Sequence, residues 1–178
     1  PAAPSDSRDL VFVGSMDWRA NQDAVRWFVT EIHPRLRAMT KYQLWVIGRN
    51  PPDWMREATA LPPEVRVTGE VPDVRPYLER AAVAIVPLRV GGGSRLKILE
   101  AMACARPVVS TTIGAEGLNV VPGRDVLLAD DSADFADQLA GLLRSTVLRE
   151  RLAAAGRRLV ETQYDWDRIH HIQREMWR

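Results

Sequence analysis

Short apolar runs alternate along the chain with longer segments in which apolar residues recur every three or four positions. The runs have the length of strands buried on both faces, and the longer segments have the period of amphipathic helices. Six runs are expected to form strands: Leu10–Gly14, Tyr42–Gly48, Val65–Gly69, Ala81–Leu88, Pro107–Thr112 and Asp125–Ala129. This alternation predicts an α/β fold, a Rossmann-like, mostly parallel sheet with helices on both faces.

The predicted helices carry apolar residues on one side. The first has its apolar face at Val25, Phe28, Val29, Ile32 and Leu36. Pro34 falls late in this helix and is expected to end or kink it. Asp130–Ser132 is expected to cap a later helix. The apolar positions of another helix alternate with arginines that we expect to form a solvated face: Arg149, Arg151, Arg157 and Arg158. A last helix, Asp165–Trp177, presents an apolar side.

A glycine-rich turn follows the fourth predicted strand. Gly91, Gly92 and Gly93 permit backbone conformations closed to other residues, and Ser94 leads into the next helix. The order strand, glycine turn, helix and strand is a βαβ unit. Its turn lies at the carboxyl end of a strand, which is where α/β sheets bind ligands.

The helix after this turn begins with two cations. Leu96, Leu99 and Ala103 mark it as helical, and Arg95 and Lys97 fall in its first turn. Cations at that end oppose the helix dipole at a cost of about 0.3–1 kcal/mol each. An anion bound to the free N–H groups of the first turn would reverse that cost. The sequence therefore favours a phosphate site here, against the alternative of two solvated cations.

This stretch resembles the donor-binding motif of retaining glycosyltransferases. The resemblance is carried by Pro87–Lys97, by Leu99-Glu100-Ala101-Met102-Ala103 and by Arg106–Thr111. It is to glycosyltransferase family 4, also called glycosyl transferases group 1, whose enzymes have the GT-B fold. That family usually has two glutamates separated by seven residues. Glu100 matches the second, whereas Gly92 stands at the position of the first.

The resemblance implies roles for individual residues. Glu100 would accept hydrogen bonds from the ribose hydroxyls, and Val71 would lie near the nucleotide base. Many members grip the diphosphate with an arginine directly after the first strand's glycine and a lysine five residues later. Here Ser15 follows Gly14, and Arg19 lies near the lysine position but not on it. The grip is therefore expected to have moved to Arg95 and Lys97.

Composition excludes several function classes. The formal net charge of +1 gives no electrostatic support for nucleic-acid binding. No apolar run approaches the length of a membrane-spanning helix. One cysteine, Cys104, leaves no internal disulfide, which favours a reducing, cytoplasmic compartment and a packed core thiol. The histidines have no metal-ligand spacing, so no metal is expected. The first strand lacks Gly-x-Gly-x-x-Gly, which disfavours a dinucleotide oxidoreductase.

The chain of 178 residues is long enough for one domain with a substantial core. Residues 1–9 are expected to be a linker, and residues 10–178 the C-terminal nucleotide-sugar-binding half of a GT-B enzyme. The acceptor half would be an N-terminal domain absent from this chain, through which peripheral membrane contact stays open. The donor would be a nucleoside-diphosphate sugar, with no other cofactor. Two alternatives remain: a non-catalytic sugar-nucleotide-binding module and a GT-B sugar-nucleotide epimerase.

Overall fold

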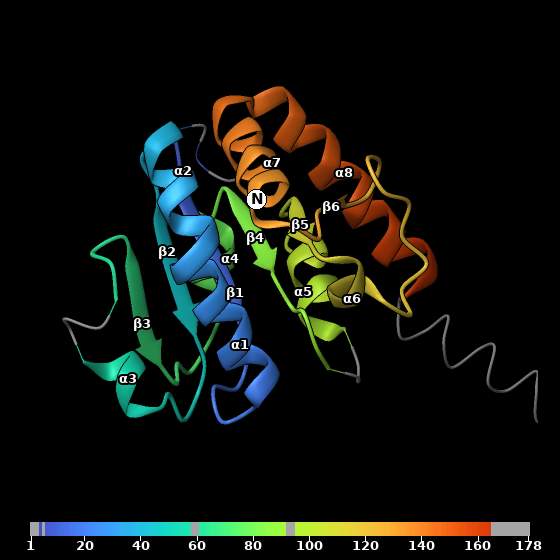
Figure 1. The fold of residues 1–178 in the computed structure, drawn as a ribbon. Coiled ribbons are helices and arrows are strands. Elements are labelled where there is room, and N and C mark those ends of the chain that lie inside the picture. Colours follow the sequence, from blue (N-terminus) through green and yellow to red (C-terminus); the bar gives the residue numbers. More distant parts are fainter. Residues whose placement is uncertain (1–3, 5, 58–60, 92–94, 165–178) are drawn as a thin grey trace, which may run out of the picture.

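A six-stranded parallel sheet forms the centre of the molecule (Figure 1). The computed structural model describes residues 4, 6–57, 61–91 and 95–164. All six predicted strands are present: β1 (Asp9–Val13), β2 (Gln43–Ile47), β3 (Val65–Gly69), β4 (Val83–Val86), β5 (Val108–Ser110) and β6 (Leu127–Leu128). Their order across the sheet is β3-β2-β1-β4-β5-β6. The strand order therefore reverses between β1 and β4, and an open α/β sheet binds its ligand at such a switch point.

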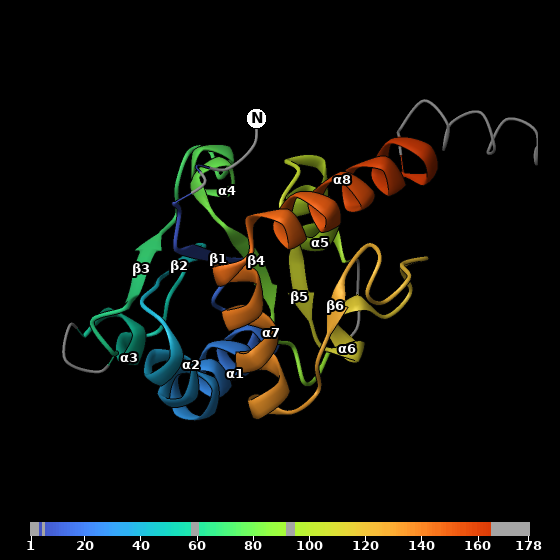
Figure 2. The same cartoon turned by 90° about the horizontal axis from the view of Figure 1, so that it is seen from above.

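Two layers of helix cover the sheet. The helices are α1 (Arg19–Trp27), α2 (His33–Met39), α3 (Asp53–Arg56), α4 (Arg75–Arg80), α5 (Leu96–Ala103), α6 (Thr112–Ala115), α7 (Ser132–Arg144) and α8 (Thr146–Gln163). Figure 2 shows α1, α2 and α7 on one side of the sheet and α4, α5 and α8 on the other. Because both faces are covered, every residue from Ala81 to Leu88 is buried. The predicted Rossmann-like fold is confirmed.

The N-terminus of α7 is capped where the sequence indicates. The carboxylate of Asp131 accepts hydrogen bonds from the backbone N–H groups of Ala133 and Asp134, both at 2.9 Å. It thereby caps α7, whose apolar residues pack against β4 and β5. The predicted cap at Asp130–Ser132 is confirmed.

The first long helix has an irregularity that the sequence misplaces. A π-helical segment, Phe28–Ile32, separates α1 from α2. Pro34 does not end the helix, since α2 continues to Met39. Pro34 instead lies in the first turn of α2, where its missing N–H is tolerated. The prediction that Pro34 would end the helix is wrong, because the change of winding occurs just before it.

The buried face of α5 also differs from the prediction. Leu96 is 54% exposed, and the helix buries Ile98, Ala101 and Met102 instead. The reason is the neighbouring helix α8, which packs on α5 so closely that a Cβ added to Gly156 would lie 3.0 Å from the Cγ of Met102. Local periodicity predicts that α5 is a helix, but its orientation is set by a partner more than 40 residues away.

The arginines of α8 are not all solvated. Arg149 is buried, and its Nη1 donates hydrogen bonds to the carbonyl groups of Leu142 and Leu143 at the end of α7. Arg157 donates to the carbonyl of Ala103, the last residue of α5, at 2.7 Å. Carbonyls at a helix end lack partners within the helix, so arginines are favourable there. The expectation of a solvated face is wrong for Arg149.

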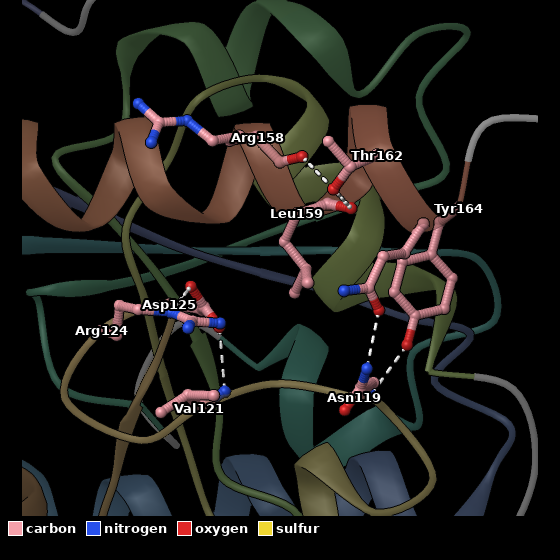
Figure 3. A network of polar contacts seen from close by, with 9 residues as sticks. Asn119, Val121, Arg124, Asp125, Arg158, Leu159, Thr162 and Tyr164 are labelled. Carbon is pink, nitrogen blue, oxygen red and sulfur yellow. Dashed lines mark hydrogen bonds and ion pairs between the residues drawn. The ribbon is translucent and has the colours of Figure 1, made fainter.

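The loop between α6 and β6 is fastened to the end of α8 (Figure 3). The backbone N–H of Asn119 donates to the Tyr164 hydroxyl, and its side chain donates to Gln163, both at 2.8 Å. Within the loop, Asp125 accepts from the N–H of Val121 at 2.9 Å. The predicted helix Asp165–Trp177 lies outside the described residues.

Two glycine substitutions test this packing in opposite directions. A Cβ on Gly48 would overlap the carbonyl oxygen of Gly14, whereas a Cβ on Gly141 in α7 meets nothing within 4 Å. We expect Gly48→Ala to lower the free energy of unfolding by about 1–3 kcal/mol, because backbone must move. Gly141→Ala should raise it by about 0.5–1 kcal/mol, because it removes a helical glycine. Urea unfolding measures both. Equal effects of the two substitutions would contradict the described approach of Gly48 to Gly14.

Candidate functional site

The loops that follow β1, β2 and β3 lie side by side at the carboxyl edge of the sheet. The N–H of Gly14 donates to the carbonyl of Ile47 at 2.9 Å, and the N–H of Gly48 donates to Gly69 at 3.0 Å. Gly48 approaches Gly14 so closely that no side chain fits between them. Glycine at both strand ends therefore brings backbone from two loops into direct contact.

A cleft of about 340 Å³ opens at these strand ends. It is lined by Val13, Gly14, Ser15, Ile47, Gly48, Arg49, Glu70, Val71 and Val74. Two of the residues predicted from the sequence, Gly14 and Val71, thus share one cleft, although 57 positions separate them. The lining combines two glycines and four aliphatic side chains with the polar residues Ser15, Arg49 and Glu70. Two other cavities, of about 210 and 610 Å³, contain none of the predicted site residues.

The ammonium group of Lys97 lies beside Gly14. Its Nζ donates a hydrogen bond to Oδ1 of Asn21 at 2.7 Å and lies 4.6 Å from the ring centre of Phe12. A Cβ on Gly14 would lie 3.0 Å from this nitrogen. The pKa of Lys97 is lowered to about 8, first by burial and then by the positive charge of Arg95, while the charge of Glu100 opposes both. Within the described part of the chain, no carboxylate lies at ion-pair distance from this ammonium.

Arg95, the other predicted cation, has a different environment. It is 7% exposed and occupies the N-cap position of α5. Its Nη2 donates to the carbonyl of Gly91 at 3.1 Å and to the Glu116 carboxylate at 3.3 Å. Its Nε is buried without a hydrogen-bond partner among the described residues. Arg95 therefore joins the glycine turn to the end of α6, and part of its hydrogen-bonding capacity is unused.

The remaining predicted residues divide into two groups. Glu100 lies on α5 about one turn beyond Lys97 and is exposed; burial nevertheless raises the pKa of its carboxyl, and the charge of Lys97 partly opposes this. Arg19 is exposed at the start of α1, and its side chain makes no hydrogen bond or ion pair with the described residues. Gly92, Gly93 and Ser94 lie outside the described residues.

Sequence reasoning missed the polar partners of the two cations. Asn21 is 8% exposed, and it follows the phase of the apolar positions of α1, which marks it as a buried polar residue. Glu116 lies 21 residues after Arg95, and no local pattern connects them. Arg49 was also missed; its Nε donates to the Ser15 hydroxyl at 2.9 Å, next to the cleft.

Neither a metal-binding cluster nor a membrane-spanning helix is present among the described residues. No group of three or more histidine, cysteine, aspartate or glutamate side chains is arranged to hold a metal ion among them. None of the described helices combines the length and apolar character needed to cross a membrane.

Comparison with known proteins gives consistent matches. The family model described as glycosyl transferases group 1 matches residues 7–145. Phosphatidyl-myo-inositol mannosyltransferase of Mycobacterium leprae is 36% identical over 129 residues, a match that covers 70% of this chain and 34% of the relative. The chain thus spans about a third of the length of this curated relative.

Solved structures share the fold. A variant of S. aureus TarM, in complex with fondaparinux, α-GlcNAc-glycerol and UDP, superposes with a TM-score of 0.79 at 17% identity, over 96% of this chain and 36% of that one. The C-terminal domain of LpcC, a glycosyl transferase group 1 family protein from Francisella tularensis, superposes with a TM-score of 0.71 at 22% identity, over 92% of this chain and 89% of that one. The fold is therefore that of one half of a GT-B glycosyltransferase.

The environment of Lys97 is directly measurable, because the chain contains only one other lysine, the exposed Lys41. We expect the Lys97 side chain to titrate near pH 8 in an NMR titration of lysine-labelled chain. Arg95→Met should raise the Lys97 pKa by removing a like charge, and Glu100→Gln should lower it. A Lys97 signal insensitive to both substitutions would contradict the described arrangement.

Proposed function

Because this chain belongs to the glycosyl transferases group 1 family, whose model matches residues 7–145, we propose that it is the donor-binding part of a retaining glycosyltransferase. The whole protein would move a sugar from a nucleoside-diphosphate sugar to an acceptor. The chain spans about a third of its curated relative, so an N-terminal acceptor domain would complete the enzyme.

One observation carries the proposal. The half-buried Lys97 ammonium lies near the first turn of α5, at the switch point of the sheet, without a carboxylate partner in the described residues. A buried cation without a counter-charge is costly, and an anion bound there would offset the cost. The free N–H groups at the start of α5 and the backbone around Gly14 suit the same anion. We assign this position to the diphosphate of the donor.

The chemistry of transfer explains the use of such a cation. The reaction breaks the bond between the anomeric carbon and the diphosphate oxygen, so negative charge grows on the diphosphate. A preorganised cation beside that charge lowers the barrier. Lys97 would contact the diphosphate directly. Arg95 would hold the glycine turn through Gly91 and Glu116 and add its charge, and its unpaired Nε gives it one further donor. The leaving phosphate would accept the acceptor's proton, so no separate base or cofactor is assigned.

The base and the ribose of the nucleoside would have separate contacts near this cation. Gly14 lies both beside Lys97 and in the cleft that contains Val71, so a nucleotide with its diphosphate at Lys97 has its base within reach of Val71. Glu100, one turn further along α5, would accept hydrogen bonds from the ribose hydroxyls.

The second candidate function is a non-catalytic binding module, because Gly92 stands in place of the first family glutamate. Nucleotide binding without transfer by the longer protein would favour it. Epimerised donor formed in the absence of an acceptor would instead identify an epimerase.

A selective loss of affinity for the diphosphate tests the site. We expect Lys97→Met to weaken the binding of a nucleoside diphosphate by about tenfold to a hundredfold, which is the contribution of a charge-assisted hydrogen bond. The parent nucleoside, which has no phosphate, should bind unchanged. Calorimetry with GDP, UDP and their nucleosides measures this, with Lys41→Met as the matched control. Equal binding of the diphosphate by wild type and Lys97→Met would overturn the assignment.

The same interaction predicts a pH dependence. The protonated ammonium binds the diphosphate, and its free pKa is about 8. Affinity should be constant between pH 7 and 7.5 and fall as pH rises above about 8, because the free lysine must then take up a proton. Lys97→Met should lose this dependence. A wild-type affinity that stays flat from pH 7 to 9.5 would contradict the prediction.

Ribose recognition has its own test. We expect Glu100→Ala to weaken a nucleoside diphosphate by about tenfold or more, since hydrogen bonds to a charged group are lost. A 2′,3′-dideoxynucleoside diphosphate should bind both chains alike, because it has no hydroxyls to offer. If the substitution weakens both ligands equally in calorimetry, Glu100 does not contact the ribose.

A further inference from the structure

The Lys97 ammonium is held by a residue from a different element. Asn21 lies on α1, 76 positions earlier in the chain, and its Oδ1 accepts from Lys97 at 2.7 Å. The amide nitrogen of the same side chain donates to the carbonyl of Ser15 at 2.8 Å. Asn21 is 8% exposed, so both bonds form away from bulk water. One buried amide thus joins the loop after β1 to the first turn of α5.

We propose that Asn21 is a positioning residue that fixes the Lys97 ammonium at the carboxyl end of β1 without neutralising its charge. This inference rests on the proposed function, because it concerns how the diphosphate cation is oriented. A carboxylate at this position would hold the lysine equally well, but it would cancel the charge that the diphosphate needs. A neutral acceptor orients the ammonium and leaves its net charge available.

Two further neutral groups lie against the ammonium, while a like charge at the N-cap of α5 and a carboxylate on α5 act on it with opposite sign. The ring of Phe12, a buried residue of β1, lies 4.6 Å from the nitrogen and attracts it through its π face. The second neutral neighbour is Gly14, where a Cβ would lie 2.7 Å from Nδ2 of Asn21 and 3.0 Å from the Lys97 nitrogen. The missing side chain of Gly14 therefore leaves the room in which the two groups meet.

The connection to Ser15 gives Asn21 a second effect. The carbonyl of Ser15 belongs to the loop that lines the cleft, and this loop is held from the other side by the bond from Arg49 to the Ser15 hydroxyl. Asn21 thus sets the relative position of the loop and the cation. A diphosphate that contacts both would find them already arranged, which reduces the ordering cost of binding.

A neighbouring residue supplies a matched control. Gln22, also on α1, donates its side-chain amide to the carbonyl of Met16 in the same loop at 2.7 Å, but it does not contact Lys97. Gln22→Ala removes a loop hydrogen bond of the same kind as the one lost in Asn21→Ala. Any difference between the two variants in diphosphate binding therefore reports the contact with Lys97.

The experiment is a double-mutant cycle in the 178-residue chain, with GDP, UDP and their nucleosides as probes. We expect Asn21→Ala to lower the affinity for the diphosphate that binds wild type by about tenfold and to leave the affinity for the nucleoside unchanged. Gln22→Ala should keep nearly the wild-type affinity for both. In a Lys97→Met background, Asn21→Ala should weaken diphosphate binding no more than Gln22→Ala does, because only its hydrogen bond to the loop is then left to lose. Asn21→Asp should lose at least as much affinity as Asn21→Ala, because its carboxylate neutralises Lys97.

Other outcomes overturn the inference. If Asn21→Ala lowers the affinities for diphosphate and nucleoside alike, or lowers the diphosphate affinity equally in the Lys97→Met background, Asn21 is a purely structural residue. Unchanged affinity in Asn21→Asp would refute the need for a neutral acceptor, and this variant keeps the test decisive if Asn21→Ala does not fold. Failure of the proposed function is distinguishable, since Lys97→Met itself would then leave diphosphate affinity unchanged.

Discussion

Burial of the central strands on both faces is the constraint that organises this molecule. β1 and β4 lie in the middle of the sheet with helices on either side, and their side chains are almost entirely excluded from water. Such strands cannot carry exposed polar groups along their length. Polar chemistry is therefore confined to their ends, and parallel pairing collects those ends at one edge. Gly14, Lys97 and the loop after β3 therefore lie at the carboxyl edge of the sheet.

The sequence predicted this framework well, because apolar runs and glycines act locally. All six strands, the cap at Asp131 and the helix after the glycine turn followed from residues a few positions apart. The failures at α5, Arg149 and Arg95 depend instead on contacts between elements, whether these are distant in the chain or only 6 or 7 residues apart. The orientation of α5 is set by α8, the burial of Arg149 by the end of α7, and the pairing of Arg95 by Glu116. Asn21 had a detectable signal, a polar residue in phase with the apolar face of α1.

The two cations near the start of α5 differ in their uncommitted charge. Arg95 shares its guanidinium with a carboxylate and a carbonyl, whereas the Lys97 ammonium donates to a neutral amide, lies over an aromatic ring and has no carboxylate at ion-pair distance among the described residues. Sequence spacing treated them as a pair, since both oppose the helix dipole. Their surroundings give them different parts in the proposed site: one organises the turn, and the other keeps a charge available for a ligand.

The π-helical segment Phe28–Ile32 has a consequence for how this helix tolerates change over evolutionary time. Asn21 and Leu36 both face inward although they are 15 residues apart, and a regular helix would put them about 60° out of phase. The wider turn of the π segment absorbs that drift. Deleting one residue there would restore regular winding and leave the two residues 14 positions apart, which a regular helix places about 40° out of phase. The segment is therefore a place where one residue can be gained or lost while the half that packs the core and the half that holds the lysine keep nearly the same register.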